Sequence, residues 1–129
     1  MLIDAHAHLD RYEDRLESAL KEIVEQRIFT ISNSMDILSY QKNLQIGERC
    51  KLILPTFGVH PRRAYQYANR LELLTEHLQT TPMIGEIGLD YHYNFSEPKI
   101  QLPIYIEQLE LAKTYNLPAV IHCREAEND

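Results

Sequence analysis

The sequence predicts an α/β fold built on a parallel sheet. Two observations support this prediction: five short apolar segments alternate with four helical segments, and each strand–helix unit is about 30 residues long. Alternation alone leaves flavodoxin-like and Rossmann folds open. However, no Gly-x-Gly-x-x-Gly follows the first strand, and His-Ala-His stands at its end instead. A dinucleotide-binding site is therefore not expected.

Local patterns justify the elements. In the first helix, Leu16, Leu20 and Ile23 recur at the spacing of one helical face. The apolar, β-branched run at 28–31 is typical of a buried strand, and Asn33-Ser-Met-Asp36 supplies capping residues for the next helix. Together such signals predict strands at 1–9, 28–31, 52–59, 83–88 and 117–124, and helices at 11–27, 36–50, 71–78 and up to about 116.

Two prolines and one histidine give sharper expectations. Proline cannot donate a backbone hydrogen bond, so Pro55 is expected near the start of its strand. For the same reason Pro103 is expected within the first turn of the last helix. His77 falls on a helix and is expected at the surface.

Length and composition describe one ordinary globular domain. The chain has 129 residues, 44% of them hydrophobic and 25% charged. It has no apolar run of about 18 residues and no basic-then-apolar leader, so we expect no membrane segment, no signal peptide and a cytoplasmic location. Cys50 and Cys123 lack the spacing of a cysteine metal site. The net charge of −6 argues against a broad basic face that coats nucleic acid, but permits a local grip on one phosphodiester with metal ions as the positive charge.

Potential metal ligands recur at the predicted strand ends. His6 and His8 share one face of the first strand, with β-carbons about 6–7 Å apart, so both can reach one cation. Glu86 lies in an apolar strand, where a carboxylate is costly unless it is paired or bound to metal. Each residue also has an ordinary interpretation: hydrogen-bonded histidines at a buried strand end, a glutamate paired with an arginine, and, for His122, a core histidine. Their common position at carboxyl ends of strands favours a shared site.

Several segments resemble the TatD-type metal-dependent deoxyribonucleases, in matching order and spacing along the whole chain. These segments are His6-Ala-His8, Gly58-Val-His-Pro61, Gly85-Glu-Ile-Gly-Leu-Asp-Tyr91, Gln108-Leu-Glu-Leu-Ala-Lys113 and Pro118-Ala-Val-Ile-His-Cys-Arg124-Glu-Ala126. The resemblance implies a TIM-type (β/α)8 barrel of the amidohydrolase-like superfamily. Residues 1–129 would form the N-terminal part of one such barrel, with its first five strands and four helices.

The resemblance also implies roles for the ligands. His6 and His8 would bind one divalent ion, Glu86 would bridge two ions and serve as the catalytic carboxylate, and His122 would bind the second ion. The two ions could be Mg²⁺, Mn²⁺ or Zn²⁺. The implied function is hydrolysis of phosphodiester bonds at DNA ends, single-stranded or 3′, by a metal-activated water. A small-molecule amidohydrolase or lactonase, and a truncated non-catalytic barrel fragment, are the alternatives.

Further residues are candidates for substrate contact or for orienting the ligands. By resemblance, His60 and Arg124 would lie at the substrate mouth. Arg62 and Arg63 are candidate phosphate contacts, each with an alternative as a solvated surface charge, and His92 lies on the loop after Glu86. Asp4 shares a face with the first two histidines and could orient one of them, and Asp90 is a similar candidate.

One feature departs from the family pattern. The family's site also uses a histidine on strand six and an aspartate on strand eight, whereas this sequence stops just after strand five. A full barrel needs about 250 residues. We therefore expect a native continuation of roughly 120 residues or more, because five barrel strands leave the first and last with open, aggregation-prone edges.

Overall fold

The computed structural model describes residues 1–93 and 95–129. The described part of the chain contains five strands and four α-helices in strict alternation, as predicted. In chain order these are β1 (Leu2–Ala7), α1 (Leu16–Gln26), β2 (Ile28–Asn33), α2 (Ile37–Arg49), β3 (Ile53–Thr56), α3 (Glu72–Leu78), β4 (Ile84–Asp90), α4 (Pro98–Thr114) and β5 (Ala119–Arg124).

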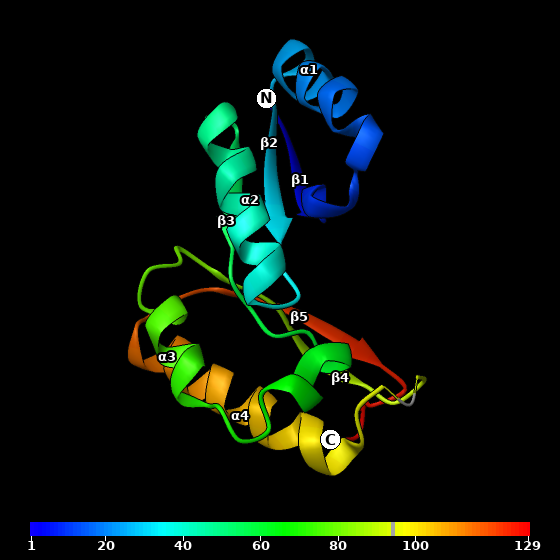
Figure 1. The fold of residues 1–129 in the computed structure, drawn as a ribbon, viewed down its shortest axis with the longest axis vertical. Coiled ribbons are helices and arrows are strands. Elements are labelled where there is room, and N and C mark those ends of the chain that lie inside the picture. Colours follow the sequence, from blue (N-terminus) through cyan, green and yellow to red (C-terminus); the bar gives the residue numbers. More distant parts are fainter. Residues whose placement is uncertain (94) are drawn as a thin grey trace.

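All strand pairs are parallel. One sheet has the order β1-β2-β3 and the other pairs β4 with β5. A bridge between Phe57 and Ile84 joins the two sheets, and the Gly85 amide donates to the Phe57 carbonyl oxygen at 2.9 Å. Figure 1 shows α1 and α2 beside the first sheet and α3 and α4 beside the second. The strands therefore follow one another in chain order across both sheets.

Two apolar cores hold the helices to the strands. One lies between β1, β3 and the first two helices, around Leu9, Leu20 and Ile46. The other includes Phe57 and Ile87, which are fully buried with α3 and α4 side chains. These two cores fix the carboxyl ends of the strands, where the predicted ligands lie.

The predicted capping segment at 33–36 is confirmed, and Asp36 is the residue that caps α2. The Asp36 carboxylate accepts a hydrogen bond from the Ser39 amide at 2.8 Å, and the Ser39 hydroxyl accepts one from the Asp36 amide at 3.0 Å. This reciprocal pair satisfies amides that the first helical turn leaves without partners. The first predicted helix, in contrast, begins only at Leu16, because two short 3-10 turns, Leu9–Arg11 and Glu13–Arg15, precede it.

Three expectations are wrong. Pro103 lies inside α4, because the helix already begins at Pro98, which takes the early position that suits a proline. Pro55 is the third residue of the four in β3, where its missing donor is tolerated because the bridge to β4, among the described residues, is made by Phe57 after β3 has ended. His77 is half-buried, since its ring packs 5.0 Å from that of Phe57 and its Nδ1 donates to the Leu73 carbonyl oxygen.

The outer edges of the strand array are open. Within the described residues, β1 pairs only with β2, and β5 pairs only with β4. Leu2 and Ile3 on β1 are 62% and 66% exposed, and Ile121 on β5 is 54% exposed. These edges match the predicted open edges. Separately, none of the described helices combines the length and apolar character needed to cross a membrane.

Candidate metal centre

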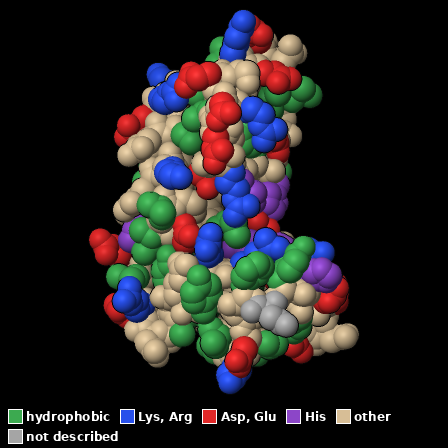
Figure 2. Space-filling view, turned by 45° about the vertical axis from the view of Figure 1, so that its right-hand side comes forward, with side chains coloured by type: hydrophobic (Ala, Val, Ile, Leu, Met, Phe, Trp, Pro, Cys, Tyr) green, Lys and Arg blue, Asp and Glu red, His purple; other side chains and the backbone are tan. Residues whose placement is uncertain are grey.

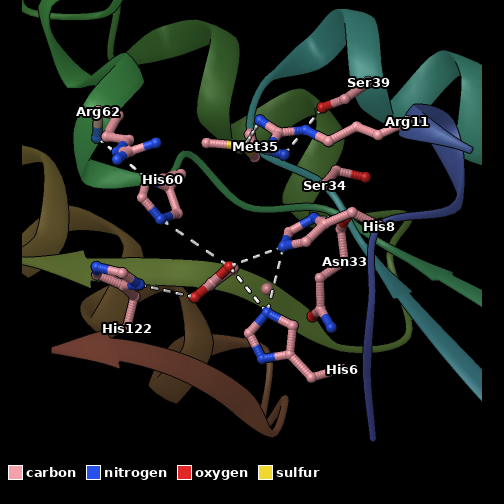
Figure 3. Close-up of polar contacts among 12 residues, drawn as sticks. His6, His8, Arg11, Asn33, Ser34, Met35, Ser39, His60, Arg62 and His122 are labelled. Atoms are coloured by element: carbon pink, nitrogen blue, oxygen red, sulfur yellow. Dashed lines mark hydrogen bonds and ion pairs between the residues drawn. The ribbon is translucent and has the colours of Figure 1, made fainter. Parts of the chain in front are cut away.

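Glu86 is the centre of the site. It lies in β4, is 3% exposed, and has the fully buried Ile84 and Ile87 close to it in the strand. Four imidazoles surround its carboxylate (Figure 3). The distances to Oε2 are 3.0 Å from His6 Nε2, 3.3 Å from His8 Nε2 and 4.0 Å from His60 Nε2, and His122 Nδ1 lies 3.0 Å from Oε1.

The structure therefore brings together the four predicted ligands. Segments around residues 6, 86 and 122 supply them from three different strand ends, although they are far apart in sequence. The alternative in which Glu86 pairs with an arginine is not observed, because among the described residues its ion-pair partners are histidines.

The first pair of histidines lies at the end of β1. His6 Nε2 and His8 Nε2 are 3.3 Å apart, so both nitrogens face one point. His8 Nδ1 donates to the Asn33 carbonyl oxygen at 2.9 Å, so the neutral ring carries its proton on Nδ1 and turns the Nε2 lone pair toward Glu86. When the ring is protonated, Nε2 instead donates a hydrogen bond to the Glu86 carboxylate. The Asp4 carboxylate accepts from the backbone amide of His6 at 3.1 Å. Asp4 thus holds the backbone at His6, and the hydrogen bond that the structure shows for its carboxylate is not to an imidazole.

A buried polar network supports His8 from behind, and the sequence reasoning missed it. Asn43 on α2 is fully buried, and its Oδ1 accepts from the Ser32 hydroxyl at 2.8 Å and the Asp10 amide at 3.1 Å. Its Nδ2 donates to the Ser34 hydroxyl at 3.1 Å and to the Asn33 carbonyl oxygen at 3.4 Å. This carbonyl is the one that orients His8. The sequence signal that could have revealed this network is the side-chain amide of Asn43 on the buried face of the helix.

His122 is held between two carboxylates. Its Nδ1 faces Glu86, and its Nε2 lies 3.0 Å from Asp90 Oδ2. Asp90 is 1% exposed, and with a carboxylate on Nε2 the imidazole can present a lone pair at Nδ1. A carboxylate that accepts the second N–H of an imidazole is the usual support of a metal-bound histidine. Asp90 thus contacts His122, and its orienting role stays a prediction.

His60 has the opposite hydrogen-bond pattern. The Arg62 amide donates to His60 Nδ1 at 3.1 Å, so in the neutral ring the proton lies on Nε2, which faces Glu86. A nitrogen that carries a proton cannot ligate a metal. His60 is therefore suited to donate a hydrogen bond, although its position would also allow it to join Glu86 and His122 around an ion.

The pKa values follow this arrangement. Burial alone would raise the pKa of Glu86, but the hydrogen bond with His8 and the other nearby imidazoles lower it to about 2. The hydrogen bond with Glu86 raises the pKa of His8 above its ordinary value, although burial opposes it. Burial lowers the pKa of His60 to about 4. At neutral pH the site thus contains an ionised carboxylate and a neutral His60.

A glycine sets the approach of β5 to Glu86. Gly88 pairs with His122 and has a φ of +140°, a conformation that side chains rarely adopt. A β-carbon at this position would lie 1.9 Å from the backbone oxygen of His122. The second glycine of the Gly-Glu-Ile-Gly motif is thus required by the close contact between the strands that carry Glu86 and His122.

The predicted substrate residues divide into two groups. Arg62 and Arg124 line the hollow that contains Glu86, and Arg62 Nε lies 3.7 Å from Asp90 Oδ2. Arg63 instead pairs with Asp36 at 3.4 Å, outside this hollow. His92 pairs with Glu125 at 2.6 Å and likewise does not line the hollow.

The side chains present suit a divalent metal. The candidate ligand atoms of His6, His8 and Glu86 lie within 4.8 Å of one another, and so do those of His60, Glu86 and His122. Imidazole and carboxylate groups are ordinary ligands of Zn²⁺ and Mn²⁺. All three residues of the first set can present a ligand atom. In the second set Glu86 and His122 can do so, whereas the tautomer of His60 places a proton on the nitrogen that faces them.

The chain is similar in sequence to known metal-dependent hydrolases and exonucleases. The chain is 32% identical over its full length to an uncharacterized metal-dependent hydrolase of Bacillus subtilis, of which it covers 53%. It is 39% identical over 74 residues to the 3′-5′ ssDNA/RNA exonuclease TatD of Escherichia coli K12, a match covering 55% of this chain and 28% of that protein. The chain thus spans about half the length of the curated relative that it matches throughout.

The fold agrees as well. The crystal structure of a TatD homologue from Escherichia coli superposes with a TM-score of 0.85 and 26% identity, over 98% of this chain and 52% of that one. The five strands are therefore part of a TIM-type barrel, as expected. The profile of the TatD-related DNase family matches residues 3–129. With nearly every residue included in that match, the chain belongs to the TatD-related DNase family.

Proposed function

We propose that this chain carries the metal-binding core of a hydrolase that cleaves phosphodiester bonds at the ends of single-stranded DNA. The observation that carries the proposal is the convergence of His6, His8 and His122 on the buried carboxylate of Glu86. The relatives named as a metal-dependent hydrolase and as an ssDNA/RNA exonuclease support it. A cytoplasmic location remains a prediction.

Two divalent ions are proposed for the site. His6, His8 and Glu86 would hold one ion, and Glu86 with His122 would hold the other, since a carboxylate has two oxygens to share. Mg²⁺, Mn²⁺ and Zn²⁺ are the candidates, and the imidazole-rich set favours Mn²⁺ or Zn²⁺. Bound ions of this kind activate a water molecule and polarise a phosphoryl oxygen.

The other residues would act on the substrate. Arg62 and Arg124 line the hollow and would bind the phosphate through their guanidinium groups. His60 would hold its proton on Nε2 and donate a hydrogen bond to an oxygen of the phosphodiester. Because burial keeps its pKa near 4, His60 stays neutral and retains one proton at this position at physiological pH.

The same ligand set could serve a small-molecule amidohydrolase or lactonase. Two guanidinium groups beside the ligands favour an anionic substrate over a neutral amide or lactone. A non-catalytic fragment would have no need of a buried, ionised Glu86 among histidines. The phosphodiesterase is therefore preferred.

The test measures release of nucleotides from an end-labelled single-stranded oligodeoxynucleotide, beside nitrophenyl ester and amide substrates. We expect EDTA to abolish DNA hydrolysis and added Mn²⁺ or Mg²⁺ to restore it. Glu86→Gln should reduce the rate by at least about 100-fold, because the shared charge is lost. Glu76→Gln, an exposed residue on α3, is the control and should behave as wild type. Hydrolysis that persists in EDTA or in Glu86→Gln would contradict the proposal.

A further inference from the structure

A second pocket lies beside the hollow that contains Glu86. Its walls are formed by Arg11, Met35, Arg62, Arg63, Tyr65 and Phe95, and we call it the side pocket. Three of these residues, Arg11, Met35 and Arg62, also line the Glu86 hollow. The two depressions are therefore neighbours with a common wall. Figure 2 shows basic side chains gathered beside histidine where the surface is hollowed.

The side pocket concentrates positive charge on a chain whose net charge is −6. It contains three guanidinium groups, and two of them have carboxylate partners among the described residues: Asp90 lies 3.7 Å from Arg62, and Asp36 lies 3.4 Å from Arg63. The guanidinium of Arg11 contacts the Met35 sulfur, and no carboxylate of the described residues lies within ion-pair distance of it. This excess suits an anion such as a phosphate.

Aromatic rings complete the side pocket. The Arg62 guanidinium lies over two rings, 4.1 Å from the centroid of Tyr93 and 5.1 Å from that of Phe95. Phe95 is 57% exposed and Tyr65 is 48% exposed, so both rings offer surface to a ligand. Exposed aromatic rings beside guanidinium groups are the usual stacking surface for bases of single-stranded nucleic acid.

We propose that the side pocket binds the nucleotide next to the scissile phosphodiester. Arg11 and Arg63 would bind its phosphate, and its base would stack on Phe95. Arg62 stands in the common wall, so a strand that leaves the Glu86 hollow passes directly into the side pocket. This assignment rests on the proposed function, because it takes a nucleic acid strand as the substrate.

The test measures binding without hydrolysis. In EDTA, a fluorescently labelled thymidine trinucleotide is titrated with protein and followed by anisotropy. Phe95→Leu and Arg11→Gln should each weaken binding about tenfold, and Phe95→Tyr should restore it. Arg11→Gln should also lower the slope of log affinity against log salt by about one. Arg70→Gln, an exposed arginine outside the side pocket, should bind as wild type.

Competition separates the possible ligands. Thymidine monophosphate should displace the trinucleotide at a concentration at least about tenfold below that needed for inorganic phosphate, because it adds a stacking base. Equal potency of the two competitors would overturn the assignment of a nucleotide, and so would wild-type binding by both Phe95→Leu and Arg11→Gln.

The outcome is independent of the metal chemistry. If hydrolysis requires metal and Glu86 but Phe95→Leu and Arg11→Gln bind as wild type, the side pocket assignment fails and the proposed function stands. If these variants lose binding while the wild type shows no metal-dependent hydrolysis, the proposed function fails, and the side pocket is a nucleotide-binding site with no cleaved bond beside it.

Discussion

His8 and His60 face the same carboxylate and respond to it in opposite ways. His8 Nε2 lies 3.3 Å from Glu86 Oε2, and this direct contact raises the pKa of His8. His60 Nε2 lies 4.0 Å from the same oxygen, and burial lowers the pKa of His60 to about 4. Their second nitrogens also differ, since His8 Nδ1 donates to a carbonyl and His60 Nδ1 accepts from an amide.

The difference shows that nearness to a carboxylate does not by itself make a metal ligand. In the neutral ring, the carbonyl behind His8 leaves a lone pair on the nitrogen that faces Glu86, as a ligand needs, whereas the amide behind His60 leaves a proton there. The backbone groups behind each ring thus divide the histidines into proposed ligands and a proposed donor. Substitutions at and behind these rings test this division.

Gly88→Ala should disrupt the pairing of β4 with β5, the strand that carries His122. The added β-carbon would collide with the His122 backbone, so we expect unfolding in urea to show a loss of about 4 kcal/mol or more. Ile121→Ala, beside His122 but 54% exposed, is the control and should cost about 0.5 kcal/mol. Equal losses in the two variants would show that the close approach of β4 to β5 is unimportant.

Lowering the pH should destabilise the metal-free protein through His60. Its folded pKa is about 4, below the unfolded value of 6.5, so between these values the unfolded chain binds more protons. The contribution of His60 to the free energy of unfolding is therefore complete above pH 6.5. It is lost as the pH falls toward 4, and this loss is about 3 kcal/mol at most.

The measurement is urea unfolding in EDTA at several pH values, with His60→Gln as the comparison. The raised pKa of His8 acts in the opposite direction, because its contribution is full below 6.5 and is lost as the pH rises through the folded value. Removal of His60 should therefore flatten or reverse the dependence of the free energy of unfolding on pH. An unchanged slope in His60→Gln would mean that His60 is not buried in the neutral form.

Asn43→Leu should loosen the support of His8. The substitution leaves Ser32, Ser34 and the Asp10 amide without their buried partner, and we expect a loss of about 2 kcal/mol in urea unfolding. Gln45→Leu, on an exposed position of the same helix, should change stability by about 0.5 kcal/mol or less. If Asn43→Leu lowers the free energy of unfolding no more than Gln45→Leu does, the hydrogen-bond network around Asn43 does not support the site.

Asp90→Asn should weaken metal binding by about tenfold, because His122 loses the carboxylate that orients it. Asp4→Asn should have a smaller effect, since asparagine can still accept the bond from the His6 amide. Mn²⁺ titration of the metal-free protein by calorimetry measures both. A larger loss in Asp4→Asn would reverse the assignment of the two aspartates.

Much of the fold could be predicted because its signals are local. Asp36 caps α2 through its own neighbour Ser39, and the alternation of apolar strands with helices requires no knowledge of packing. The errors arose where tertiary contacts decide: His77 packs on Phe57, and Pro103 is tolerated within a helix that begins earlier. No local pattern contains this information.

The site was predictable for a related reason. Ligands at carboxyl ends of parallel strands must meet at one edge, so His6, Glu86 and His122 could be grouped before their distances were known. The role of Asn43 depends on which face of α2 is buried, and the tautomer of His60 depends on one backbone amide. The side pocket likewise depends on how the loop with Phe95 lies against Arg62. These features come from packing rather than sequence.

Mn²⁺ binding to Glu86→Gln and His60→Gln, each measured by calorimetry against the metal-free wild type, tests the division of roles most directly. We predict that Glu86→Gln weakens Mn²⁺ binding by at least about 100-fold, because both proposed ions share this carboxylate. His60→Gln should stay within about threefold of wild type, because its Nε2 proton prevents ligation. Wild-type affinity in Glu86→Gln, or an equal loss in His60→Gln, would contradict a centre built on Glu86 with His60 as a donor.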